Sequence, residues 1–158
     1  MRKNLTWEEW KKDAVKSGAL DGLEYCVLRG PAEGLNGYVC FPSRPVRETG
    51  YSGILTYVPV HGGITFATDM DEGKFVYGFD TAHCDSDKFP RDTPEWIVEQ
   101  INIMVAGIKR AVEVEEQYLL AHSNEDKARA ADAVWEVTDN VSKETNFGVS
   151  INLLAGKL

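Results

Sequence analysis

The first segment that could do chemistry is His61-Gly62-Gly63-Ile64-Thr65. Paired glycines after a histidine permit backbone angles closed to other residues, and they let a ligand approach the main chain closely. Free N–H groups there can bind an anion or a carbonyl. Taken alone, Gly62-Gly63 could also be an ordinary bend between two strands, with His61 as a partly buried side chain.

The second such segment runs from Gly78 to Asp87, where an apolar run ends and polar side chains follow. Its candidate site residues are Asp80, His83 and Asp85. Residues 69–73 read as a hairpin connection, which should carry the two segments to the same end of a sheet. We therefore expect His61, Gly62, Gly63, Thr65, Asp80, His83 and Asp85 to form one functional site.

The pattern does not identify an enzyme, and the sequence favours a binder over a catalyst. Two histidines are the catalytic groups of a metal-independent phosphodiesterase, in which one imidazole removes a proton and the other donates one. That chemistry usually places a hydroxyl residue two positions after each His, but Gly63 and Asp85 stand there. A divalent cation on His83 and the neighbouring aspartates is a weaker alternative, because no ligand spacing matches a known motif.

Composition excludes several classes. The chain has 158 residues, with 17 Lys and Arg against 25 Asp and Glu and a formal net charge of −8. Binding to long nucleic acids relies on Lys and Arg, so a polymer partner is not expected. No apolar run reaches the roughly 18 residues of a membrane span, and residues 1–9 do not resemble a signal peptide. We expect a cytoplasmic protein without a membrane or a cofactor.

The three cysteines fit a reducing compartment, because they show no zinc-site or disulfide spacing. Cys26 and Cys40 sit in apolar runs and are expected to be core residues. Cys84 lies in the polar loop beside Asp85. A carboxylate raises a thiol pKa, so a nucleophilic role for Cys84 is disfavoured.

Hydrophobic periodicity predicts an α+β fold built as a single domain over 1–158. Thr6 with Glu9 predicts a capping box at the start of a short helix over 6–17, stopped by Gly18. Strand-like runs follow, rich in Val, Ile, Tyr and Phe. These runs cover 23–29, 35–41, 54–60, 64–68 and 74–80, and they predict an antiparallel-rich sheet of about five strands.

Two helices are expected after the sheet. Pro94, behind the cap residue Thr93, fits the first helical position, and apolar residues recur at helical spacing to about Ala121. A second helix is expected over 125–143, and the run 149–154 could be a final strand or a subunit-contact tail. The core is assigned to 23–109, with a helical C-terminal extension over 110–158.

The two polar segments resemble a family of small, largely uncharacterised proteins of tailed bacteriophages and prophages. The matching motifs lie between Gly37 and Lys109. They are Gly37-Tyr38-Val39, Phe41-Pro42, His61-Gly62-Gly63-Ile64-Thr65 and Gly78-Phe79-Asp80-Thr81-Ala82-His83. Relatives commonly carry His-Pro in the loop where this chain has Ser43-Arg44-Pro45, so Arg44 could take over a ligand contact.

The resemblance implies a biological context. Some phage protein families sequester or destroy the nucleotide second messengers of bacterial immune systems, and by analogy this chain is expected to do so. A pocket for an adenine nucleotide needs an aromatic face, cations or N–H groups for phosphates, and polar groups for riboses. The aromatic face could come from Tyr38, Phe66, Tyr51 or Phe79. The phosphates could be bound by Arg44 and Arg47 together with Gly62 and Gly63. The riboses could be bound by Thr65, Asp80 and His83.

The leading hypothesis is therefore a phage-encoded homo-oligomer that sequesters a small anionic nucleotide in the host cytoplasm. One alternative is a phosphodiesterase that cleaves a cyclic nucleotide through His61 and His83. The other is an acidic protein that inhibits a host factor by binding it. Acidic residues concentrate over 112–144, away from Arg44 and Arg47, so a small anion remains compatible with the negative charge.

Overall fold

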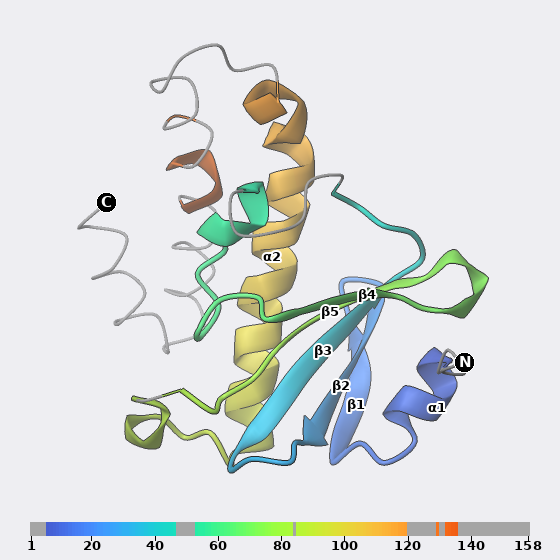
Figure 1. The fold of residues 1–158 in the computed structure, drawn as a ribbon, viewed down its shortest axis with the longest axis vertical. Helices are drawn as coiled ribbons and strands as arrows, with labels where there is room; N and C mark the ends of the chain where they lie inside the picture. Colours follow the sequence, from blue (N-terminus) through green and yellow to red (C-terminus); the bar gives the residue numbers. More distant parts are fainter. Residues whose placement is uncertain (1–5, 47–52, 84, 120–128, 130–131, 136–158) are drawn as a thin grey trace.

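The computed structural model describes residues 6–46, 53–83, 85–119, 129 and 132–135. Within them, five strands form one antiparallel sheet in the order β1-β2-β3-β5-β4. The sheet, the short N-terminal helix and the long C-terminal helix make an α+β fold, as expected (Figure 1). The strands are β1 (Lys16–Leu20), β2 (Leu23–Arg29), β3 (Leu35–Phe41), β4 (Phe66–Asp69) and β5 (Phe75–Phe79). The helices are α1 (Trp7–Lys11) and α2 (Pro94–Leu119), with 3-10 turns η1 (Ile54–Tyr57), η2 (Asp71–Gly73) and η3 (Ser86–Lys88).

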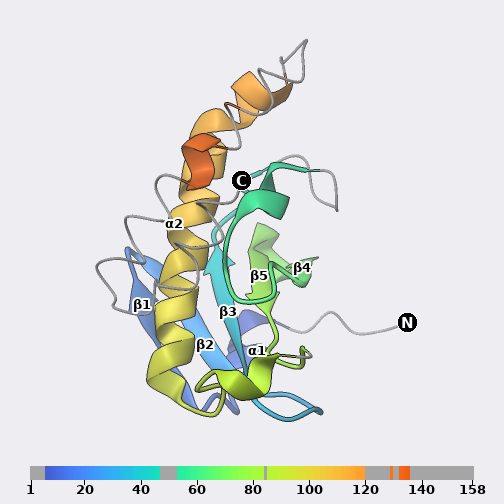
Figure 2. The same ribbon diagram turned by 90° about the vertical axis from the view of Figure 1, so that its left-hand side faces the viewer.

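Helices cover both faces of the sheet, α2 on one face and α1 on the other (Figure 2). Side chains alternate along a strand, so in β5 Phe75, Tyr77 and Phe79 join the core under α2. Val76, between them, joins the smaller cluster under α1. Because both faces are buried, the central strands read as nearly continuous apolar runs.

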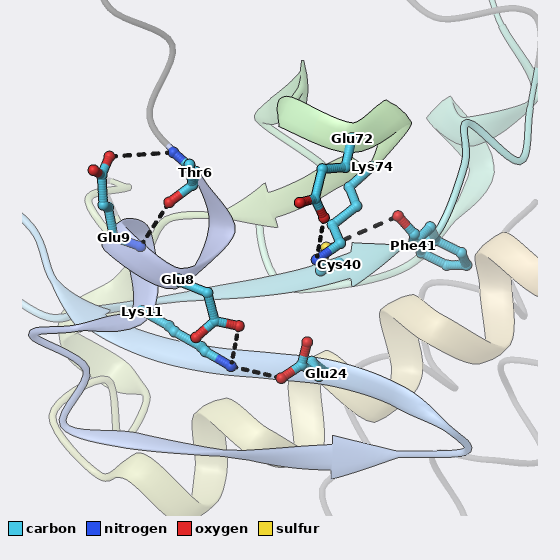
Figure 3. Close-up of polar contacts among 9 residues, drawn as sticks. All are labelled: Thr6, Glu8, Glu9, Lys11, Glu24, Cys40, Phe41, Glu72 and Lys74. Carbon is cyan, nitrogen blue, oxygen red and sulfur yellow. Dashed lines mark hydrogen bonds and ion pairs between the residues drawn. The ribbon is translucent and has the colours of Figure 1, made fainter.

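The helix α1 begins at the expected cap (Figure 3). The Glu9 N–H donates to Thr6 Oγ1 at 3.1 Å, and the Thr6 N–H donates to Glu9 Oε2 at 3.3 Å. The Lys11 ammonium pairs with Glu8 and, at 2.6 Å, with Glu24 of β2. These contacts, with Trp7 buried beneath, fasten the helix to the sheet.

The expected helix over 6–17 was too long, because the helix ends at Lys11 and strand β1 begins at Lys16. Asp21 and Gly22 have φ of +55° and +80° and join β1 to β2 through a two-residue turn. Two consecutive positive φ values are the mark of a type I′ hairpin turn, for which Asp-Gly is a preferred sequence. The Asp21-Gly22 pair was thus the sequence signal for β1.

The expected strand over 54–60 was also wrong. Ile54–Tyr57 form the 3-10 turn η1, and the chain then runs without regular structure through Val60. Ile54, Leu55 and Val58 are buried against the α2 side of the core. Their spacing of one and then three fits one turn of helix, and Pro59 lacks the N–H that a central strand requires.

The remaining expectations fare better. Strands 23–29 and 35–41 are confirmed, and the hairpin over 69–73 joins β4 to β5, although β4 begins two residues later than expected. Helix α2 runs close to the expected 94–121. Of the second expected helix, residues 132–135 are helical, and the rest of 125–143 lies largely outside the described residues, as does 149–154. No helix among the described residues combines the length and the apolar character needed to cross a bilayer.

Candidate functional site

A tight turn presents His61. The Gly63 N–H donates to the Val60 carbonyl at 2.8 Å, which makes His61 and Gly62 the two central residues of a four-residue turn. Gly62 has φ +72°, as a type II turn requires at its second central position. A Cβ on Gly62 would also collide with Nε2 of His83. The glycine therefore serves both the turn and the close approach of the second histidine.

The His61 ring lies against the start of α2. The backbone N–H of His61 donates at 3.0 Å to Oε1 of Gln100, a buried residue of α2. Its ring centroid lies 4.7 Å from that of Phe89 and 5.3 Å from that of Trp96. Nε2 lies 2.8 Å from Oγ of Ser86, a residue with no exposed surface. The imidazole is thus held by a hydroxyl at Nε2 and packs at steep angles against two aromatic rings.

Asp80 organises the polar residues that follow β5. Its Oδ1 accepts the Ala82 N–H at 3.0 Å, and its Oδ2 accepts the Thr65 hydroxyl at 2.9 Å. Nε2 of His83 lies 3.4 Å from Oδ1, an ion-pair distance once the imidazole is protonated. That nitrogen is buried without a hydrogen-bond partner, so the contact is electrostatic rather than a directed hydrogen bond. The side chains of Asp80 and His83 are each 36% exposed, so atoms of both other than Nε2 of His83 are accessible to a ligand.

The structure brings the two histidines together. Their ring centroids are 5.9 Å apart and the ring planes are inclined at 66°. Burial lowers the pKa of His61 below its usual value, and the nearby His83 lowers it further, while Asp80 acts in the opposite direction. His61 is therefore neutral at neutral pH and can offer one N–H and one lone pair.

Six expected site residues converge here, from two separate stretches of chain. His61, Gly62 and Gly63 form the turn, Thr65 leads into β4, and Asp80 and His83 follow β5. Asp85 lies in the adjoining loop, exposed and paired with Lys88 at 3.3 Å. Within the described residues, no three His, Cys, Asp or Glu side chains converge as a metal site would require.

Tyr38 lies on the other side of the sheet, in an aromatic cluster under α1. Its ring packs edge-on against Trp10 and Phe66, with centroids 5.4 and 5.5 Å away. Burial raises the pKa of the Tyr38 phenol, and the negative charge of Asp80 adds to this effect. The Tyr38 ring is therefore engaged in packing and is not placed beside the histidines.

Arg44 is placed away from the two histidines. Its guanidinium carbon lies 5.5 Å from the ring centroid of Phe75, at the start of β5, whereas Asp80 follows the end of that strand. Five residues at about 3.3 Å each separate the two positions by roughly 16 Å. Arg47 and Tyr51 lie outside the described residues, and Phe79 is a core side chain.

Sequence reasoning missed the residues that contact His61, namely Ser86, Phe89 and Trp96 at its ring and Gln100 at its backbone N–H. Ser86 lies inside the polar segment 78–87 and could have been included. Trp96 and Gln100 are four residues apart at the start of α2, the spacing that puts two side chains on one face of a helix. Nothing in the sequence shows that this face meets His61.

The site and fold together define an α+β protein with a two-histidine site at one end of its sheet. No protein-family model, curated protein or solved structure matches the chain.

Proposed function

We propose that this protein binds a nucleotide-derived signalling molecule at the two-histidine site and holds it intact. The observation that supports this most is the pair of imidazoles, whose ring centroids are 5.9 Å apart. One of them, His83, lies beside the Asp80 carboxylate, which accepts from a hydroxyl and a backbone N–H. Such a set provides N–H donors for phosphate oxygens. The carboxylate retains lone pairs that can accept ribose hydroxyls.

The site is held in place before any ligand arrives. His61 is fixed by Ser86 and Gln100, and Asp80 by Thr65 and Ala82. Groups that are already ordered lose little entropy on binding, which favours tight capture of a small molecule. The role against a bacterial immune signal rests on the resemblance to phage proteins.

A phosphodiesterase is the second candidate function, and the distance between the imidazoles is the observation that favours it. Two rings with centroids 5.9 Å apart could flank one phosphate, with one removing a proton and the other donating one. The same geometry therefore serves capture or cleavage, and the fate of the bound molecule distinguishes them.

The test is to incubate the protein with cyclic mono-, di- and trinucleotides and cyclic ADP-ribose, remove unbound material, denature the protein by heat and identify what is released. Release of an intact nucleotide supports capture, and release of a linear or cleaved product supports the phosphodiesterase. His61→Ala and His83→Ala should each abolish retention, while Lys12→Ala, at an exposed residue next to α1, should retain the nucleotide as the unaltered chain does. Retention by both histidine variants would show that the site lies elsewhere.

A further inference from the structure

Ser86 is the buried centre of the contacts between the two histidine segments. Its Oγ lies 3.3 Å from the backbone nitrogen of His83 and 2.8 Å from Nε2 of His61. Its own N–H donates to the His83 carbonyl at 3.0 Å. Ser86 has no exposed surface, so bulk solvent does not reach its side chain.

The Ser86 hydroxyl proton has one candidate acceptor among the described residues, Nε2 of His61. The backbone N–H of His83 is a donor, so Oγ is the acceptor in that bond. A buried hydroxyl also needs an acceptor for its own proton, since an unsatisfied one costs about 1–3 kcal/mol. Among the described residues, Nε2 of His61 is the one further partner of this oxygen. The arrangement that gives every proton of this group an acceptor therefore leaves Nε2 of His61 unprotonated.

A neutral imidazole with an unprotonated Nε2 carries its hydrogen on Nδ1. Burial keeps His61 neutral, as described above. The titratable groups acting on the ring are His83 and Asp80, both after β5. The α2 residues in contact with His61 are Trp96 and Gln100, which do not titrate. No described residue bonds to Nδ1, and this atom is not among the buried polar atoms without partners, so it reaches solvent.

We propose that Ser86 is a positioning residue that holds His61 as the Nδ1–H tautomer, so that His61 presents a hydrogen-bond donor to an acceptor oxygen of the ligand. This inference rests on the proposed function and refines it. A general base would have to offer an unprotonated nitrogen to the substrate, and the unprotonated nitrogen of His61 is occupied by the buried hydroxyl. The arrangement thus gives His61 the role of hydrogen-bond donor to a phosphate or carbonyl oxygen and not that of general base.

The tautomer can be measured directly on the ligand-free full chain. Long-range ¹H–¹⁵N correlation spectra at neutral pH distinguish a protonated from an unprotonated ring nitrogen. The chain has three histidines, and His61→Gln and His83→Gln spectra assign their signals. The expected result is a protonated Nδ1 and an unprotonated Nε2 in His61. A protonated Nε2 in the neutral ring would overturn the proposal.

Substitution of Ser86 tests the cause. Ser86→Ala removes the hydroxyl, and the His61 signal should move toward a mixture of tautomers, while Ser86→Thr, which keeps a hydroxyl, should restore Nδ1–H. An unchanged tautomer in a folded Ser86→Ala protein would contradict the positioning role. If Ser86→Ala does not fold, the spectrum of the unaltered chain still decides the tautomer.

The ligand measurement separates this inference from the proposed function. For the nucleotide retained in the release experiment, Ser86→Ala should raise the Kd roughly tenfold, the value of one neutral hydrogen bond of about 1.4 kcal/mol. An Nδ1–H tautomer in a protein that retains no nucleotide would refute the function but not the positioning of His61. Retention of a nucleotide by a protein with the Nε2–H tautomer would refute the positioning of His61 but not the function.

Discussion

The conformations of individual residues account for the shape of the site. Gly62 is the clearest case, because its positive φ and the His83 ring beside it both exclude a side chain. Gly63 has φ +79° but no atom within 4 Å of a Cβ built on it. A side chain at Gly63 would therefore cause backbone strain alone, whereas one at Gly62 would also crowd His83.

Gly62→Ala should destabilise the protein more than Gly63→Ala. Each variant forces a left-handed conformation on alanine, at a cost of about 1–2 kcal/mol, and Gly62→Ala also displaces the His83 ring. Urea unfolding should show the larger loss for Gly62→Ala, and nucleotide retention should be lost in that variant alone. Equal losses of stability and binding in both would show that the contact with His83 does not matter.

The lowered pKa of His61 makes stability depend on pH. Because the folded-state pKa lies below the unfolded value of 6.5, the unfolded chain binds more protons as the pH falls. His61 should therefore leave stability unaffected above pH 6.5 and reduce it as the pH drops through its folded pKa. Urea midpoints of the wild-type chain and His61→Gln should change in parallel above pH 7 and diverge below 6.5, with the wild type falling faster. Parallel curves down to pH 5 would contradict the assigned pKa.

The two strand cysteines should be inert as thiols. Burial raises the pKa of Cys26 to about 12 and also raises that of Cys40, so little thiolate forms at pH 8. In a Cys84→Ser background, iodoacetamide at pH 8 should leave the native protein unlabelled and add two groups after unfolding in urea. Rapid labelling of the native protein would show that the sheet opens at β2 or β3.

At the scale of elements, the sequence was most informative where side-chain pattern and local geometry agree. The boundaries of β2 and β3 were predicted to the residue, because β-rich runs there end at Gly and Pro. Ile54 to Val60 has an equally apolar composition, yet it packs beneath α2 instead of pairing with a strand. The apolar composition of a segment predicts that it is buried. Whether it pairs as a strand depends on residues distant in the sequence, which a local pattern does not reveal.

The site shows the same division. The turn at His61 and the polar segment after β5 could be read from glycine and polar spacing, and the β4–β5 hairpin joined them correctly. The contribution of α2 could not be read, because Trp96 and Gln100 meet His61 only through tertiary packing. Arg44 was misplaced because its loop leaves the opposite end of β3.

The α1 element depends on its cap, since five residues are too few for a helix to be stable alone. Thr6→Ala removes the acceptor for the Glu9 N–H and should cost about 1 kcal/mol in unfolding free energy. Thr6→Ser keeps the hydroxyl and should remain within a few tenths of the wild-type value. Equal stability of the alanine and serine variants in urea unfolding would mean that Trp7 packing holds α1 without its cap.

At the scale of the whole molecule, α2 runs from the two histidines to turns that carry an exposed apolar side chain. Its first turns carry Trp96 and Gln100, which contact His61. Val112 lies 16 residues after Trp96, about 24 Å along the helix axis. Val112 is 45% exposed, one of two large apolar side chains in the described residues that are so open. A contact with another subunit at this end of α2 would leave the two-histidine site accessible.

We expect a homo-oligomer that associates through the later turns of α2. Light scattering at micromolar concentration should give a multiple of the 17.6 kDa chain mass. Val112→Asp places a charge in the expected interface and should shift the mass toward the monomer, because burying an unpaired carboxylate is strongly unfavourable. Val15→Asp is the matched control, since Val15 is 48% exposed just before β1, and it should leave the mass unchanged. A monomeric wild type would refute association, whereas dissociation by Val15→Asp alone would move the interface to the edge of the sheet at β1.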